Sequence, residues 1–266
     1  ANSTGAFQIM AVVGFVTPSQ VGYLLRLRTD RLEVWNGTTW VVVYTGFTGG
    51  VTDYWTFANW GSEIMMCNGV DKIYRYNPET GDTGFIDESV PARHITVFGG
   101  RVVATSVNDS TYKAYRVQWS VKNDNQDWTG EGSGWEDLYA APGGRVDSAH
   151  GCFPITDDTA LVIREQSIWQ MSTTGQVLAP FRFSRISGEL GTRCRRSIAE
   201  VPGGYAMVSR DSVIVVGLSS IATIGDNVRE VLVPSITDYN AVVGEYDSTR
   251  SEYRLAIGST VWRYSF

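Results

Sequence analysis

The sequence predicts an all-β fold. Glycine occurs 28 times and aromatic residues make up 12% of the 266 residues, a composition typical of many short strands joined by tight turns. Runs of strand-forming residues recur along the chain, and Asn-Gly or Gly-Gly pairs separate several of them. Such pairs between apolar runs are a strong short-range signal of a β-hairpin. Helices are therefore expected to be scarce.

The first strands form a meander over residues 20–46. Strand-forming residues run from 23 to 35 with a break at Thr29-Asp30, and Asn36-Gly37 then leads into an apolar run over 40–44. The Asn-Gly pair predicts a hairpin turn between the last two of these strands.

The same order of strand, turn and strand recurs at intervals of about 35–50 residues, which is the period of a propeller blade. The recurring strands are predicted over residues 64–67, 72–76, 95–98, 101–105, 115–119, 160–164, 167–171, 205–209, 213–216, 241–246, 252–257 and 260–264. These units predict a β-propeller of about six blades, with blade edges near residues 48, 90, 134, 175 and 218. A two-sheet β-sandwich of similar strand count is the alternative.

Residues 5–14 form a further strand that stands apart from the first meander. We expect it to pair with the last blade, so that the N- and C-terminal strands close the ring and remove exposed sheet edges. The most polar stretches, 106–112 and 122–137, are interpreted as loops between strands rather than linkers. Residues 1–266 are therefore predicted to be a single β-propeller domain.

Charge, hydropathy and cysteine content each exclude a class of protein. The formal net charge is −6 with a pI near 5.0, the wrong sign for coating DNA or an anionic membrane through bulk electrostatics. No apolar run approaches the roughly 20 residues that span a bilayer, so we expect a soluble chain without membrane insertion. Cys67, Cys152 and Cys194 are an odd, widely spaced set, which predicts reduced buried thiols rather than disulfides or a zinc site.

Residues capable of catalysis are present but lack a catalytic pattern. His94 and His150 are the two histidines, and neither lies in a nucleophile-elbow or metal-ligand motif. Glycosidases need only two carboxylates, and the candidates are Asp53, Asp71, Glu131, Glu136, Asp137, Asp157 and Glu189. Each is interpreted more simply as a solvated turn residue. Residues 123–127 have the oxygen-rich composition of a calcium loop but lack the EF-hand glycine and terminal glutamate. We expect no enzyme, no metal and no cofactor.

One stretch of the acidic chain is locally basic. It contains Arg182, Arg185, Arg193, Arg195 and Arg196. Arginine suits both phosphate groups and the carboxylates of a neighbouring subunit, so this stretch is a candidate DNA-facing or subunit-interface site. Exposed arginines without a partner are the alternative.

Several short sequence motifs follow one another in an order similar to that of the motifs in a known family. They are WTFANW at 55–60, CNGVD at 67–71, PAR at 91–93, VFGGRVVA at 97–104, RVQWS at 116–120, NQDW at 125–128, EQSIW at 165–169 and ISGELGT at 186–192. Together they resemble the β-propeller tail nozzle or tail hub (tail tubular) proteins of double-stranded DNA tailed phages. The resemblance runs from about residue 20 to the C-terminus.

The resemblance implies a structural virion protein, made in the bacterial host cytoplasm and assembled into the tail or neck. In that family a ring of propeller subunits, commonly six, continues the DNA channel below the portal and adaptor. It therefore implies a hexameric ring, contacts with adaptor or portal-side and other tail proteins, and transient passage of viral DNA. Trp119, Trp128 and Trp169 match family positions that pack blades. A carbohydrate-binding or glycoside-cleaving propeller is the alternative function.

Overall fold

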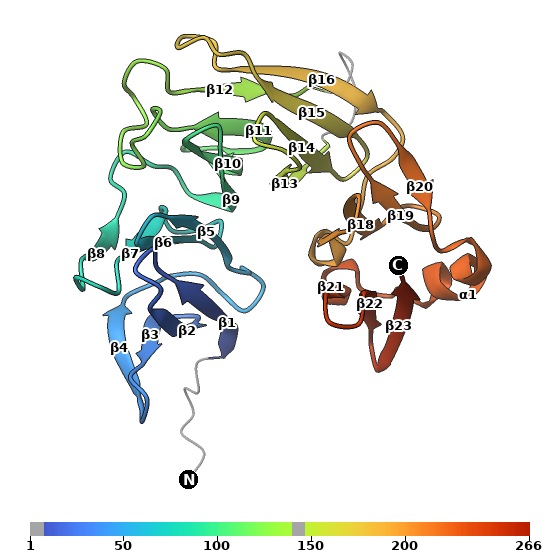
Figure 1. Ribbon diagram of the computed structural model, residues 1–266, viewed down its shortest axis with the longest axis horizontal. Helices are drawn as coiled ribbons and strands as arrows, with labels where there is room; N and C mark the ends of the chain where they lie inside the picture. Colours follow the sequence, from blue (N-terminus) through green and yellow to red (C-terminus); the bar gives the residue numbers. More distant parts are fainter. Residues whose placement is uncertain (1–7, 140–146) are drawn as a thin grey trace. The chain divides into compact units, whose positions relative to one another are not determined.

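The computed structural model describes residues 8–139 and 147–266, and its fold is an all-β propeller of six antiparallel sheets. Each sheet is built from strands that are consecutive in the sequence, as the colours of Figure 1 show. The prediction of a propeller with six blades is therefore confirmed. The sandwich alternative is not what the chain forms.

The first three sheets have four strands each. The first sheet contains β1 (Ile9–Val16), β2 (Gly22–Arg28), β3 (Arg31–Trp35) and β4 (Trp40–Thr45). The second contains β5 (Thr56–Trp60), β6 (Glu63–Cys67), β7 (Tyr74–Tyr76) and β8 (Thr83–Phe85). The third contains β9 (Ala92–Phe98), β10 (Arg101–Asn108), β11 (Tyr112–Trp119) and β12 (Gly134–Asp137).

The last sheet differs from the others by having three strands. The fourth sheet contains β13 (Ala149–Pro154), β14 (Thr159–Arg164), β15 (Ile168–Thr173) and β16 (Phe181–Ser187). The fifth contains β17 (Ala199–Val201), β18 (Gly204–Val208), β19 (Val213–Val216) and β20 (Ile221–Thr223). The sixth contains β21 (Val243–Asp247), β22 (Glu252–Ile257) and β23 (Thr260–Ser265). Between the fifth and sixth sheets lies the short helix α1 (Arg229–Leu232).

The hairpin predicted at Asn36-Gly37 is confirmed. Trp35 and Trp40 are paired across the antiparallel strands β3 and β4. Gly37 takes φ 96°, a conformation open to glycine at little steric cost. The Asn36 side chain accepts hydrogen bonds from the Thr38 and Thr39 amides at 3.0 and 2.8 Å. The local sequence therefore holds this turn through both residues of the pair.

The expected pairing of the N-terminal strand with the last blade is wrong. β1 pairs antiparallel with β2, with Val12 opposite Arg26 and Phe15 opposite Tyr23. Residues 5–7 of the predicted strand lie outside the described residues. The turn after β1 is held by a hydrogen bond from the Thr17 amide to the Val21 carbonyl, so a local hairpin takes the strand into the first sheet. β1 is thus one of the four strands of the first sheet.

The predicted blade edges at 48 and 90 fall between sheets, but those at 134, 175 and 218 do not. They fall inside the third, fourth and fifth sheets, each before or within the last strand. The last strands β12 and β20 are short and read GWED and IAT. Their few strand-forming residues do not distinguish them from loops, so the sequence predicts these blade edges too early.

Contacts divide the chain into two compact units. One comprises the described residues up to Phe153 together with Ser172–Arg182, and the other comprises Pro154–Met171 and Phe183–Phe266. In the first unit, an apolar layer between the first and second sheets includes Phe15, Leu25, Leu27, Ile64, Met66 and Tyr74. A second layer, between the second and third sheets, includes Met65, Cys67, Ile95, Val102, Ala104 and Trp128. In the other unit, the fifth and sixth sheets enclose Val208, Val213, Leu232, Tyr253 and Leu255.

Three buried serines satisfy backbone amides at the ends of strand ladders. Ser89, Ser120 and Ser197 accept hydrogen bonds from the amides of Ile73, Val102 and Val208, at 3.1, 3.1 and 3.0 Å. Each hydroxyl also donates to a carbonyl, those of Ile86, Val121 and Cys194. An unpaired buried amide costs stability, so each hydroxyl replaces a carbonyl where the ladder stops.

Candidate functional site

One face of the first sheet carries large apolar side chains that the rest of its own compact unit leaves exposed. Val12 and Val16 of β1 are 55% and 60% exposed, Leu24 of β2 is 39%, Trp35 of β3 is 36% and Val42 of β4 is 47%. The register places Leu24 beside Gly14, and Trp35 and Val42 follow on the next two strands. We call this set of five residues the outer apolar face.

Two glycines hollow this face. Gly14 and Gly22 have nothing within 4 Å of the position that a Cβ would occupy. A shallow depression lies there, bordered by Val16, Leu24 and Trp35. The face is thus concave as well as apolar. Both properties are found in surfaces that receive a partner's side chain.

The buried carboxylate beside the outer apolar face, Glu33, is paired by arginines of the same face. Arg26 donates to the Glu33 carboxylate at 2.6 Å, and its guanidinium carbon lies 4.3 Å from the centre of the Trp40 ring. Trp40 in turn contacts Trp35, with ring centres 5.4 Å apart. Glu33 is 4% exposed. Burying this face against a partner would therefore leave the Glu33 carboxylate paired.

The sequence reasoning missed this face. Its signal was present, because strands 9–16 and 40–45 carry apolar residues on both alternations, which is the pattern of strands covered on both sides.

The arginine stretch does not form one patch. Arg182 and Arg185 are three residues apart in β16, so they project from opposite faces of that strand. Arg193 pairs with Glu165 at 3.1 Å and lies over the Tyr239 ring at 4.8 Å. The hydrogen bond from Arg193 to Glu165 contributes most to raising the pKa of this guanidinium. Arg195 and Arg196 are half-buried in a 3₁₀ turn. The stretch therefore offers separate contacts rather than a continuous basic track.

The three tryptophans occupy different environments. Trp119 is buried, donates to the Gly132 carbonyl at 3.2 Å and meets the Phe181 ring edge-on at 5.2 Å. Trp128 is buried in the layer between the second and third sheets and donates to the Asn125 carbonyl at 3.0 Å. Trp169 is half-buried and donates to the Ser167 hydroxyl at 3.1 Å.

The nucleophile and base candidates lie in packed surroundings. All three cysteines are buried, and none of them forms a disulfide. Burial raises the pKa of the Cys152 thiol to about 12, and burial is also the main cause that raises the pKa of Cys194 to about 12. A thiol with so high a pKa is a poor nucleophile at neutral pH. His94 packs on Phe153, with ring centres 4.9 Å apart.

The candidate carboxylates hold turns or face solvent. Asp53 accepts from the Gly50 amide at 2.8 Å, and Asp71 accepts from the Asn68 side chain at 2.8 Å. Asp137 pairs with Arg116 at 2.6 Å. The exposed ones are Glu131, Glu136, Asp157 and Glu189. In the oxygen-rich segment 123–127, Asp124 and Asp127 accept from backbone amides that follow them. Among the described residues no group of three or more His, Cys, Asp or Glu side chains could hold a metal ion.

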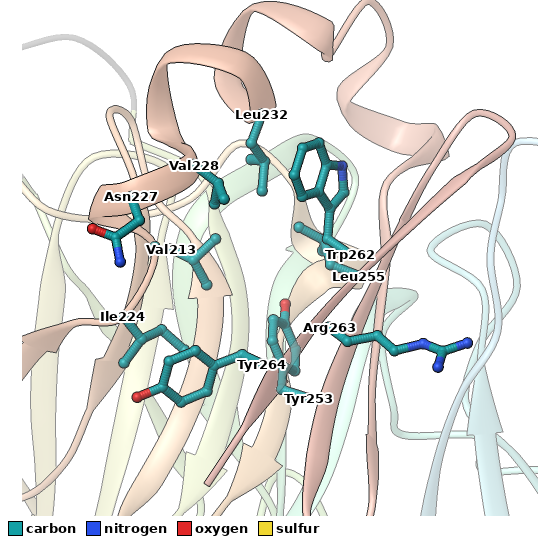
Figure 2. Close-up of a pocket in the computed structure, with 11 residues that line it drawn as sticks. Val213, Ile224, Asn227, Val228, Leu232, Tyr253, Leu255, Trp262, Arg263 and Tyr264 are labelled. Carbon is teal, nitrogen blue, oxygen red and sulfur yellow. The ribbon is translucent and has the colours of Figure 1, made fainter.

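A cavity of about 200 Å³ lies between the fifth and sixth sheets. Val213, Ile224, Val228 and Leu232 line one side, and Tyr253, Leu255, Trp262 and Tyr264 line the other (Figure 2). The Tyr253 hydroxyl donates to the Ser197 carbonyl at 2.7 Å, and burial raises the pKa of that phenol. Its lining is mostly apolar, so the cavity suits an apolar group.

In the described part of the chain, no helix has the length and apolar character to cross a membrane.

No family model matches the chain, and no curated protein matches its sequence. Solved structures do resemble its fold. The extracellular domain of a one-component system from B. thetaiotaomicron is 12% identical with a TM-score of 0.62 over 100% of this chain. The N-terminal domain of Nup159 is 10% identical with a TM-score of 0.57, over 96% of this chain and 75% of that one. The computationally designed Ika8 protein is 10% identical with a TM-score of 0.51, over 97% of this chain and 74% of that one.

At these identities the likeness concerns the fold alone. The chain spans about a third, 34%, of the length of the B. thetaiotaomicron protein. Propellers host many unrelated functions, so the function has to be argued from this chain's own surfaces.

Proposed function

We propose that this chain is a structural virion protein of a tailed phage, a tail nozzle, hub or neck component that forms part of the DNA-ejection conduit. It acts by assembly and carries out no chemistry of its own. Its subunits form a homo-oligomeric ring that contacts adaptor or portal-side and other tail proteins, while viral DNA passes transiently. The observation that carries the proposal is the outer apolar face.

Apolar side chains scattered singly on a surface need no explanation, but a contiguous set does. The outer apolar face brings five large apolar residues together on four adjacent strands. Its buried carboxylate, Glu33, pairs with Arg26 and Arg28 of the same face. These are features of a surface covered by protein, and a ring of identical subunits covers such a surface by repeating one head-to-tail contact.

The phage assignment itself rests on the ordered sequence phrases that resemble the tail nozzle and hub family. Charge is compatible with it, because a chain of net charge −6 repels DNA on average and lets it slide without tight binding. Separate arginines such as Arg182 and Arg185 could then contact DNA or a neighbouring subunit locally.

Two measurements test the proposal. Peptide mass spectrometry on purified, nuclease-treated particles from the source culture should find this chain at a fixed low ratio to the portal protein. Its absence from the particles would overturn the virion assignment.

The second measurement addresses the face. Val12→Glu should prevent self-assembly, measured by sedimentation velocity, without changing the far-ultraviolet circular dichroism. Val51→Glu is the matched control, because Val51 is 54% exposed in a turn and Val12 is 55% exposed on the face. Equal assembly of both variants would remove the outer apolar face from the interface.

A further inference from the structure

In residues 8–139 and 147–266, which the structure describes, the sixth sheet has no fourth strand, so β23 is its edge. The other five sheets have four strands, whereas the sixth has the order β21-β22-β23. Five of the six residues of β23 are exposed, on both alternations, including Val261 at 53% and Tyr264 at 38%. In an antiparallel pair, alternate residues direct their N–H and C=O groups away from the neighbouring strand. The outer side of β23 is thus a template for one more strand.

The second sheet shows what a fourth strand contributes. There Tyr74 of the third strand lies opposite Phe85 of the fourth strand β8. The two rings meet edge-on at 5.0 Å, and Phe85 also contacts the Tyr44 ring at 5.6 Å. A fourth-strand side chain therefore completes the apolar layer next to the third strand.

In the sixth sheet the corresponding space is a cavity. Trp262 and Tyr264 of the third strand lie opposite Leu255 and Tyr253 on β22, and all four line the hollow of about 200 Å³. Figure 2 shows the Trp262 and Tyr264 rings on the cavity side, with Leu232 and Ile224 across from them. An apolar side chain beside these rings would fill space of the kind that Phe85 fills in the second sheet.

The other face of the same edge carries an uncompensated positive charge. Arg254 and Arg263 are directly opposite each other on β22 and β23, and like charges in such a pair repel. Arg254 is compensated by Asp247 at 2.5 Å and Glu252 at 3.2 Å. Arg263 is exposed, and no carboxylate of the described residues pairs with it. A carboxylate on an adjacent strand would supply the missing partner.

We propose that β23 accepts an extended strand from a partner polypeptide as the fourth strand of the sixth sheet. The strand alternates apolar and acidic residues. Its apolar side chains lie beside Trp262 and Tyr264 at the cavity, and the acidic residue between them lies across from Arg263. Backbone hydrogen bonds give affinity and the alternating side chains give specificity, as in other cases of strand addition. This site is separate from the outer apolar face, so it stands whether or not the virion assignment holds.

The test uses the full chain and a fluorescein-labelled probe peptide with the core Thr-Val-Glu-Val-Thr between flanking serines. Fluorescence anisotropy should show binding with a dissociation constant below about 1 mM. The same peptide with N-methyl groups on alternate amides should not bind, because it cannot extend the sheet. A peptide with lysine in place of glutamate should bind more weakly.

Arg263→Glu tests the charge contact. This variant should bind the glutamate peptide about tenfold more weakly and should prefer the lysine peptide. Arg250→Glu is the matched control, because Arg250 is exposed in the turn before β22 and should leave both affinities unchanged. Thermal melts of the two variants verify that they remain folded.

Three results would overturn the proposal. One is the absence of binding at 1 mM of probe, about the weakest affinity that such a strand contact should give. Another is binding that survives N-methylation or that Arg263→Glu does not alter. The third is a dimer of the chain alone that Arg263→Glu dissociates, since a second copy rather than a partner strand would then occupy the edge.

Discussion

The two faces of the first sheet are built from the same four strands and differ in what covers them. On the inner face Phe15, Leu25 and Leu27 are at most 1% exposed, because the second sheet packs against them. On the outer face Val12 and Leu24, their neighbours along the same strands, are 55% and 39% exposed.

The comparison shows that apolar residues on a strand do not by themselves identify the core. A sheet that faces water on one side normally alternates apolar and polar residues. The first sheet instead keeps apolar residues on both alternations of β1 and β4, and its buried carboxylate Glu33 pairs with Arg26 and Arg28. Its outer face is apolar, as a protein interior is, but the rest of its own compact unit leaves it exposed. This combination is expected of a docking surface.

The largest expected effect is on the inner face. Leu25→Ala should lower the free energy of unfolding by about 2–5 kcal/mol, because it removes buried methyl groups and leaves a cavity. Leu24→Ala, one residue earlier on the outer face, should cost less than about 1 kcal/mol in the isolated chain. Urea denaturation measures both. Equal losses would mean that the outer face is already covered in solution.

A smaller effect is expected from the ion pair at the centre of the outer face. Glu33→Gln should destabilise the chain by about 1–3 kcal/mol, because Arg26 loses a charged acceptor in a poorly solvated place. Asp211→Asn is the control, since Asp211 and Arg210 are 3.9 Å apart with side chains 81% and 85% exposed. That variant should have the same melting temperature as the wild type. A Glu33→Gln chain with an unchanged melting temperature would show that solvent already screens the ion pair between Arg26 and Glu33.

The smallest effect is a change with pH that belongs to the inner layer. Burial raises the pKa of Tyr74 and of Tyr76 above 10.0. Because the unfolded tyrosines ionise first, their contribution to stability is present below pH 10 and is lost as the pH rises through the folded pKa. Unfolding free energies measured on both sides of about pH 10 should fall less steeply for Tyr74→Phe than for the wild type. Identical slopes would contradict the burial of this phenol.

Short-range signals predicted the propeller but not its edges. Asn36-Gly37 and Gly99-Gly100 encode turns directly, since Gly37, Gly99 and Gly100 take positive φ angles. The strands next to them are rich in β-branched residues. β12 and β20 owe their strand conformation to the neighbours with which they pair, and such pairing leaves little trace in their own residues. The turn between β1 and β2, residues 17–21, contains no Asn-Gly or Gly-Gly pair, so the sequence gives no hairpin signal that assigns β1 to the first sheet.

The candidate sites were less predictable than the fold. The arginine stretch was visible in the sequence, but the alternation of β16 separates Arg182 from Arg185. The outer apolar face was overlooked because exposure depends on which sheet packs where. The sequence does not predict that the sixth sheet has three strands in the described residues, because the sequence patterns of three-strand and four-strand blades are similar until the strand pairing is known.

The three serines at the ladder ends have a consequence for how local opening can be observed. The amides of Ile73, Val102 and Val208 are each held by a hydroxyl that also bonds a carbonyl outside its own strand pair. Each of these amide hydrogens exchanges with solvent deuterium once its hydrogen bond to the serine hydroxyl opens. The central ladder of the sheet can stay closed meanwhile. These positions are therefore natural reporters of the motion of single blades, one each for the second, third and fifth sheets.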